Sequence, residues 1–175
     1  MNKVNLHEIK EEVRRLESPK KTFCNVQKSI TKALTNRDEH KRQPPFDMDY
    51  VTLPPGKKDF PYHVHATGWE LYCAVKGSAH MRVEEDLVEL KPGDAIQCPP
   101  GVAHQIINDS DADFEYWLIS SSPDFDTAYY PDSDKLTVQQ ILGANKEGVG
   151  NDRGGSSLWT RFREGLGTSY WEGEE

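Results

Sequence analysis

The sequence predicts an all-β protein, an antiparallel sandwich or barrel, because short runs suited to strands recur from about residue 46 to residue 120. The runs are rich in β-branched and aromatic residues, and Gly, Pro, Asn or Asp closes most of them. Between residues 79 and 84 apolar and polar side chains alternate, as in a strand with one buried face. The two faces carry Ala79, Met81 and Val83 on one side, and His80, Arg82 and Glu84 on the other.

The predicted strands follow one another with short turns between them. They cover residues 49–53, 62–66, 70–75, 79–85, 87–90, 95–98, 104–107 and 114–120. A chain of 175 residues suits one domain with extensions. We therefore expect a barrel core over residues 46–122, an N-terminal helix and arm over residues 1–45, and a C-terminal extension over residues 123–175.

The N-terminal part is expected to begin with a short amphipathic helix over residues 4–16, where apolar residues recur at roughly helical spacing. Asn5 would cap this helix, which would end before Pro19. We expect it to lie on the surface of the domain, with a partner-binding helix as the alternative. Residues 21–34 could hold one or two strands, and the polar, proline-rich stretch 36–45 predicts a loop.

After residue 122 the strand pattern fades. A short helix is expected from Thr137 to Leu142, and the Gly-rich stretch 143–157 is expected to be a mobile loop. A phosphate cradle is disfavoured there, because the GxxxxGK[ST] pattern is missing. The last residues are too apolar for a free tail, so we expect their aromatic side chains to pack on the barrel or on a second subunit. These side chains belong to Trp159, Phe162, Tyr170 and Trp171.

The composition narrows the classes of partner. A net charge of −8 disfavours nucleic acid and anionic membrane surfaces as partners. The three cysteines form no CxxC pair, and an odd number is a poor disulfide framework, so a reducing compartment is the simplest setting. The first residues do not resemble a secretory signal, and no apolar run approaches the ~20 residues that span a bilayer. We expect a cytoplasmic protein.

Four residues at strand ends form a candidate metal site. His63 and His65 are two apart on a predicted strand, so they project from the same face. A turn follows, and Glu70 opens the returning strand. His104 begins another strand directly after a Pro-Pro-Gly turn. Imidazoles with a carboxylate suit a first-row divalent metal, with Fe, Mn, Ni, Co and Zn as candidates.

At these positions the sequence resembles the two conserved motifs of the cupin superfamily. The second motif fits without departure, whereas the spacing from Gly56 to His63 in the first is one residue longer than usual, which affects only a loop. The matching residues are Gly56, His63, His65, Glu70 and Gly77 in the first motif, and Gly93, Pro99, Gly101, His104 and Asn108 in the second. The stretches YYPDSDK and WEGE also look like those of small bacterial cupins of unassigned function.

The resemblance implies a double-stranded β-helix, a jelly-roll barrel with an open end. It also implies that the equivalents of His63, His65, Glu70 and His104 bind the metal inside the barrel. Cupins of this kind are often homodimers whose terminal arms pack across the interface, so a homodimer is expected.

The remaining polar residues divide into two groups. His7, His40 and His80 lie outside the motifs and are not expected to bind metal. Cys73 and Cys98 are interpreted as small core residues. Two further residues, Tyr72 and Met81, are in phase with positions that face the pocket. They could line it, although plain core packing is the alternative.

Two functions fit such a site, and a purely structural metal is a third reading. The first is a mononuclear metalloenzyme, a dioxygenase, isomerase or decarboxylase, acting on a small oxygen-rich molecule such as a keto acid, enediol, sugar or dicarboxylate. The second is a non-catalytic module that binds or senses a small polar ligand. The sequence points to no general acid or base, so the catalytic residues stay open.

Overall fold

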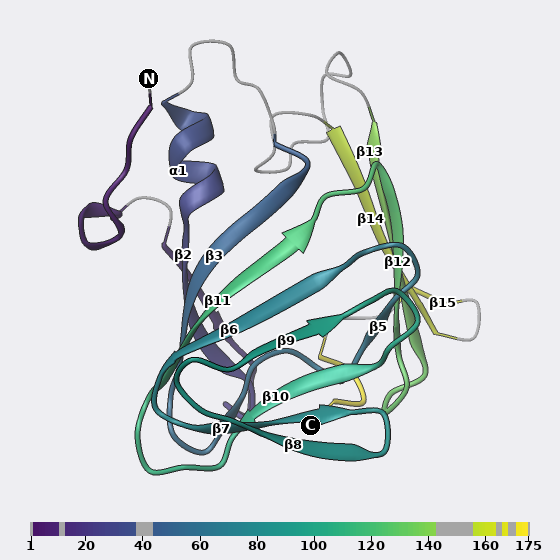
Figure 1. Cartoon of the computed structure of the whole chain (residues 1–175). Helices are drawn as coiled ribbons and strands as arrows, with labels where there is room; N and C mark the ends of the chain where they lie inside the picture. The colour runs from purple at the N-terminus through teal and green to yellow at the C-terminus, as the bar shows by residue number, and fades with distance from the viewer. Residues whose placement is uncertain are drawn as a thin grey trace.

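The computed structural model describes residues 2–10, 13–37, 44–142, 156–163, 166–167 and 171–174. Their strands form three antiparallel sheets (Figure 1). The first sheet has six strands in the order β1-β2-β3-β11-β6-β9. These strands are β1 (Val13–Glu17), β2 (Cys24–Ser29), β3 (Phe46–Leu53), β11 (Phe114–Ser121), β6 (Glu70–Lys76) and β9 (Ala95–Cys98).

The second sheet has four strands and the third has five, in the orders β4-β10-β7-β8 and β15-β14-β13-β12-β5. The second consists of β4 (Lys57–Lys58), β10 (His104–Asn108), β7 (Ala79–Val83) and β8 (Asp86–Leu90). The third consists of β15 (Leu166–Gly167), β14 (Ser156–Arg163), β13 (Lys135–Leu142), β12 (Phe125–Tyr130) and β5 (Val64–His65).

From β6 to β11 the chain alternates between the first two sheets. β6, β9 and β11 belong to the first sheet, and β7, β8 and β10 belong to the second. Each crossing wraps the chain once around a shared interior, which gives the double-stranded β-helix that the sequence predicts. The fold class is therefore confirmed.

The core lies between the first two sheets. Strand β11 shows why, since Phe114, Tyr116 and Leu118 alternate with less buried residues and face inward. The rings of Phe114 and Tyr116 stack with centroids 5.3 Å apart. Burying a large apolar side chain contributes roughly 1.5–3 kcal/mol. The core cluster comprises Val51, Leu53, Tyr72, Ala74, Ala79, Met81, Leu90, Cys98, Ile106, Phe114, Tyr116 and Leu118.

Two motif residues hold turns of the barrel. Gly77 has a φ of 76°, and a Cβ added to it would lie 2.3 Å from the carbonyl oxygen of Asp113, so only glycine fits. Asn108 is fully buried, and its amide nitrogen donates to the backbone oxygens of Leu53 and Ala112. Asn108 therefore ties the end of β10 to β3 and to the next turn.

The helix expected over residues 4–16 is wrong. Among the described residues of this range the only helical element is a short 3₁₀ turn, η1 (Leu6–Glu8), with the Asn5 side chain accepting from the His7 backbone as a cap. Residues Val13–Glu17 instead form β1, which pairs with β2 along its whole length. Pairing with a neighbouring strand outweighs helical spacing here, because a helix this short is marginal without packing.

Residues 21–34 hold one strand, β2, in agreement with the expectation of one or two strands. It is followed by a helix that was not expected, α1 (Ile30–Asn36), whose first turn is capped by the Ser29 hydroxyl accepting from the Lys32 backbone. The helix expected from Thr137 to Leu142 is also wrong, since these residues belong to β13, which pairs with both β12 and β14. The loop expected over 143–157 lies largely outside the described residues.

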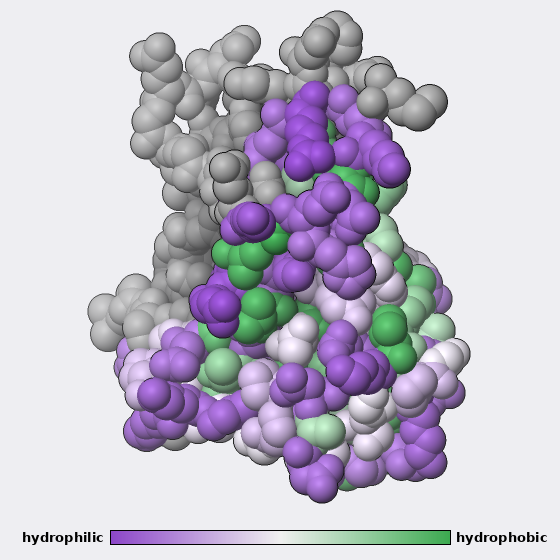
Figure 2. All heavy atoms as spheres, turned by 90° about the vertical axis from the view of Figure 1, so that its left-hand side faces the viewer, coloured by the Kyte–Doolittle hydropathy of each residue, from purple (hydrophilic) through white to green (hydrophobic). Residues whose placement is uncertain are grey.

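The surface in Figure 2, on the side of α1 and the N-terminal strands, is mainly hydrophilic, with small separate hydrophobic patches. Among the described residues no helix is both long and apolar enough to cross a membrane. The domain boundaries predicted from the sequence stay a prediction. The described part of the extension does pair with the barrel, because β12 adds to β5.

A buried carboxyl links the N-terminal strands to the core. Asp59 accepts hydrogen bonds from the Asn25 amide on one oxygen and from the Tyr116 hydroxyl on the other. Burial raises the pKa of Asp59 to about 7, although these two hydrogen bonds act in the opposite direction. The folded protein therefore binds a proton at Asp59 at pH values where the unfolded chain does not.

This proton makes stability depend on pH. A carboxyl whose pKa is raised on folding contributes stability below its ordinary pKa of 3.8 and loses it as the pH rises through about 7. The neutral, isosteric variant Asp59→Asn should not lose this stability as the pH rises. We therefore expect the difference in free energy of unfolding, variant minus wild type, to increase by on the order of 2 kcal/mol or more between pH 4 and pH 8. Urea unfolding at several pH values measures this. A constant difference between the two proteins would contradict it.

Candidate metal centre

The candidate site forms where short strands of all three sheets meet. His63 precedes β5 and exchanges backbone hydrogen bonds with His104 at the start of β10, with N···O distances of 3.2 and 2.9 Å. His65 ends β5, and Glu70 begins β6 in the first sheet. The turns identified in the sequence therefore bring four separate strand ends together at one place.

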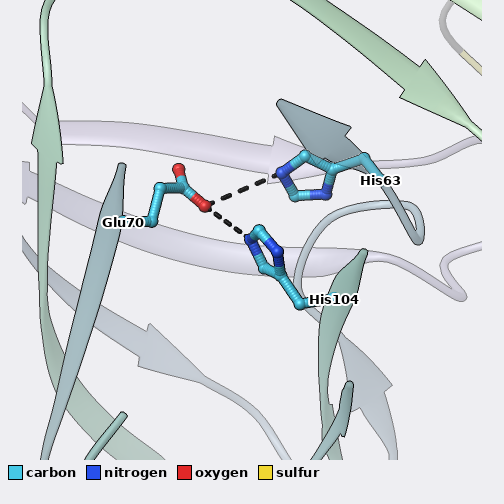
Figure 3. Close-up of side chains that lie close together, drawn as sticks. All are labelled: His63, Glu70 and His104. Carbon is cyan, nitrogen blue, oxygen red and sulfur yellow. Dashed lines mark hydrogen bonds and ion pairs between the residues drawn. The ribbon is translucent and has the colours of Figure 1, made fainter. Parts of the chain in front are cut away.

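Three of the four predicted ligands converge on one point. The ligating atoms of His63, Glu70 and His104 all lie within 4.8 Å of one another. Glu70 Oε2 lies 2.7 Å from His104 Nε2 and 3.8 Å from His63 Nε2 (Figure 3). The carboxylate reaches in from β6 and meets both rings, which is the arrangement expected of residues that share one ion.

His65 lies beside this group without joining it as closely. Its Nε2 faces the other carboxylate oxygen of Glu70, Oε1, at 3.8 Å. Its side chain is 22% exposed, against 2% for His104. The structure thus brings His65 to the edge of the site, and its role as the fourth ligand stays a prediction.

A hydrogen bond at Nδ1 orients each of the three imidazoles. His63 Nδ1 donates to the Pro61 carbonyl at 2.8 Å, and His104 Nδ1 donates to the Val102 carbonyl at 2.9 Å. Carbonyl oxygens only accept, so Nδ1 carries a proton in both rings and each Nε2 is directed at Glu70. Such outer hydrogen bonds are characteristic of metal-binding histidines.

Asp126 plays the corresponding part for His65. Its Oδ2 lies 2.5 Å from His65 Nδ1, and its Oδ1 accepts from the backbone and hydroxyl of Thr67. Burial opposes ionisation, but His65 and Thr67 outweigh it and lower the pKa of Asp126 to about 2. Asp126 in turn raises the pKa of His65, against the effect of burial.

The electrostatics of the group reflect one buried carboxylate among imidazoles. Burial alone would raise the pKa of Glu70, but His104 and His63 hold it well below its usual value. Burial lowers the pKa of His63. Burial also opposes the charged form of His104, yet contacts with Cys98 and Glu70 raise its pKa to about 10. An anion surrounded by directed Nε2 atoms is a donor set that fits a divalent cation.

Tyr72 and Met81 have different surroundings. The Tyr72 hydroxyl donates to Glu70 Oε2 at 2.6 Å, and its ring lies 5.7 Å from that of His104. Met81 is fully buried in the hydrophobic core, where it lies opposite Val88 on β8 and Ile106 on β10. Tyr72 therefore positions a candidate ligand, whereas Met81 fits the alternative of plain core packing.

Sequence reasoning missed some of the contacts of the site. Cys98, interpreted as a core residue, is buried in the core cluster but also lies opposite Glu70 in the β6–β9 pair and contacts His104. Asp126 and Tyr130 come from the segment interpreted as an extension, and the Tyr130 ring stacks on His63 with centroids 6.0 Å apart. The alternation of FDTAYY could have revealed their shared face.

His7, His80 and Cys73 lie apart from the site. His80 pairs with Asp109 on the surface, and His7 belongs to the exposed turn η1. His40 lies outside the described residues. Cys73 is half-buried on β6, out of phase with Glu70.

Comparison with known proteins agrees with this geometry. A family model described as a cupin domain matches residues 49–120. No curated protein matches the sequence. Solved structures share the fold, three of them at 19–21% sequence identity, and at this level of identity they show the fold alone.

The first of these structures is a protein from Acidithiobacillus ferrooxidans provisionally named a sugar phosphate isomerase, with 21% identity and a TM-score of 0.68 over 89% of this chain and 86% of that one. The second is a sugar phosphate isomerase of the cupin superfamily from Silicibacter pomeroyi, with 20% identity and a TM-score of 0.69 over 93% and 92%. The third is a protein from Thermotoga maritima predicted to be an oxalate decarboxylase, with 19% identity and a TM-score of 0.55 over 69% and 98%.

The motifs, the alternation of strands between two sheets and the histidines gathered around Glu70 all coincide with the segment that the family model matches. The chain therefore contains a segment, residues 49–120, that matches the cupin domain family.

Proposed function

We propose that this protein is a mononuclear metalloenzyme that acts on a small oxygen-rich molecule. The observation that carries the proposal is the convergence of His63, Glu70 and His104, with both imidazole Nε2 atoms directed at one carboxylate. His65 would complete the ligand set. A divalent ion held there supplies Lewis-acid or redox chemistry to a bound oxygen ligand.

The chain's own residues would bind and orient that ion. Tyr72 and the Nδ1 acceptors hold the ligands in place, and Asp126 keeps His65 protonated on Nδ1. The names of the structural neighbours include isomerases of sugar phosphates and a decarboxylase, which supports enzymes of these types as candidates. A non-catalytic sensor of a small ligand is the alternative. The free cysteines suit the cytoplasm that we expect.

Metal content tests the site directly. Protein purified without added metal should contain about one transition metal per chain, and His104→Ala should remove it, because the ion would lose an almost fully buried ligand. The matched control is His80→Ala, which deletes a partly exposed imidazole outside the site and should retain the metal. Elemental analysis gives the result. A wild-type protein that stays metal-free even after reconstitution would end the proposal.

Turnover separates the enzyme from the sensor. A screen of enediols, keto acids, sugars and sugar phosphates should show oxygen uptake or product formation that His65→Ala abolishes. Ligand-induced thermal stabilisation without any product would favour the sensor instead.

Metal binding should release a proton. His104 has a pKa of about 10 when Glu70 is its partner, so at pH 7.5 its imidazole carries a proton that an incoming ion must displace. The apparent affinity should therefore rise by about tenfold per pH unit between pH 6.5 and pH 8.5. Calorimetry in buffers with different ionisation enthalpies counts the released protons. Binding that is independent of both pH and buffer would contradict this prediction.

We also propose that the protein forms a homodimer through the outer face of the third sheet. Phe125, Tyr129 and Leu136 are exposed there, and Tyr129 lies opposite Leu136. A hollow of about 360 Å³ adjoins Tyr129, and its lining also includes Val64, His65 and Pro100. Exposed apolar residues gathered on one face are typical of interfaces.

Charged substitutions on that face test the dimer. Tyr129→Glu with Leu136→Glu should shift the mass from two chains to one in light scattering, because burying two carboxylates costs more than the contact gains. Leu87→Glu, at an exposed apolar position on β8, is the matched control and should not change the mass. A monomeric wild-type protein would refute this interface.

A further inference from the structure

We propose that the inner face of β13 contains an anion-binding subsite beside the metal centre, and that the Glu174 carboxylate occupies it in this structure. The subsite would take the phosphate or carboxylate group of a small ligand whose other end reaches the metal. The assignment to that ligand rests on the proposed function, whereas the binding of an anion does not.

The subsite is built around a buried cation. Lys135 Nζ lies 2.8 Å from Glu174 Oε1, and the two side chains are 1% and 2% exposed. The Ser133 hydroxyl donates to the same carboxylate oxygen at 2.5 Å. An ammonium group and a hydroxyl that meet one oxygen are the donors that an anionic group requires.

This cation lies close to the candidate metal ligands. Lys135 Nζ is 5.3 Å from the centre of the Tyr130 ring, and that ring stacks on the imidazole of His63. Lys135 and Tyr130 are partners in the β12–β13 pair, so both face inward. One aromatic ring therefore separates the cation from a candidate ligand, a distance that one small molecule can span.

A second observation points to a missing ligand group. Thr137 is the next inward-facing residue along β13, and its hydroxyl is buried without a hydrogen-bond partner. A buried hydroxyl without a partner is costly in a folded protein. A ligand larger than one carboxylate, with several oxygens, could use it together with Lys135.

The carboxylate that fills the subsite comes from outside the three sheets. Glu174 belongs to the turn Trp171–Glu174, closed by a hydrogen bond from Glu174 N to Trp171 O. The turn packs against the residue before β2 through Trp171, whose ring lies 5.4 Å from that of Phe23. This turn, drawn in yellow in Figure 1, belongs to no strand. A carboxylate held by a turn can be replaced more readily than one held by a strand.

A purely structural ion pair explains less of this geometry. Buried ion pairs are weak contributors to stability, since desolvation offsets the attraction between the charges. A structural pair would also not require a free hydroxyl at Thr137 or a position beside His63. An anion site that holds the protein's own Glu174 carboxylate accounts for the buried ion pair, the Thr137 hydroxyl and the position beside His63.

Phosphate binding to metal-free protein is the test. Wild type, Glu174→Gln and the double variant Lys135→Met/Glu174→Gln are treated with chelator and titrated with inorganic phosphate at constant ionic strength, by calorimetry and by thermal unfolding. The removal of the competing carboxylate should tighten phosphate binding by at least tenfold in Glu174→Gln. The double variant should lose this binding. The matched control is Glu89→Gln, which neutralises a carboxylate paired with Lys91 on the surface and should behave like wild type.

The outcomes are distinguishable. If phosphate raises the melting temperature of Glu174→Gln no more than that of Glu89→Gln, the subsite is refuted and the pair is structural. The comparison of melting temperatures also works if Glu174→Gln is unstable. If the subsite binds anions, phosphate should restore the stability that this variant has lost. Titration with acetate in place of phosphate identifies which anion the subsite prefers. Since no metal is present, failure here leaves the proposed metalloenzyme intact, and a metal-free native protein leaves the subsite intact.

Discussion

The contact between Glu70 and the surrounding imidazoles is the interaction on which the rest of the site depends. A carboxylate buried in a barrel is costly unless it is paired and hydrogen-bonded. Here it is paired with His104 and accepts from Tyr72 on the same oxygen. The pairing can form only because every imidazole is held by an acceptor at its other nitrogen.

These acceptors explain why such short strands suffice to position the ligands. β5 has only two residues, and His63 lies just outside it, so strand geometry alone would leave both rings free to rotate. The Pro61 carbonyl and the Asp126 carboxylate remove that freedom. One of these acceptors lies two residues away in the chain and the other lies in a different strand. The site therefore requires the pairing of β5 with β12 as well as the two sequence motifs.

Much of the barrel could be predicted because the signals for its strands lie within short stretches of the sequence. Alternating side chains and Gly or Pro turns mark the strands from β3 to β11 except the two-residue β4, and the motifs mark the three ligands that converge. The strand β1 could not be predicted, since its identity depends on pairing with β2 and its own apolar residues repeat at helical spacing. The contacts of Asp126 and Cys98 with the site could not be predicted for a related reason. Their relation to the site comes from register across the sheets, which a single sequence does not display.

The inner face of β12 and β13, in the third sheet, is unusually polar for a buried surface. A sheet that only closed a barrel would present apolar residues to the interior. This one presents Asp126, Tyr130, Lys135 and Thr137, all largely buried. Two of them contact histidines of the candidate centre, and a third carries a positive charge one ring away. A polar wall of this kind fits the proposed anion subsite, in which the third sheet would form one side of a ligand pocket.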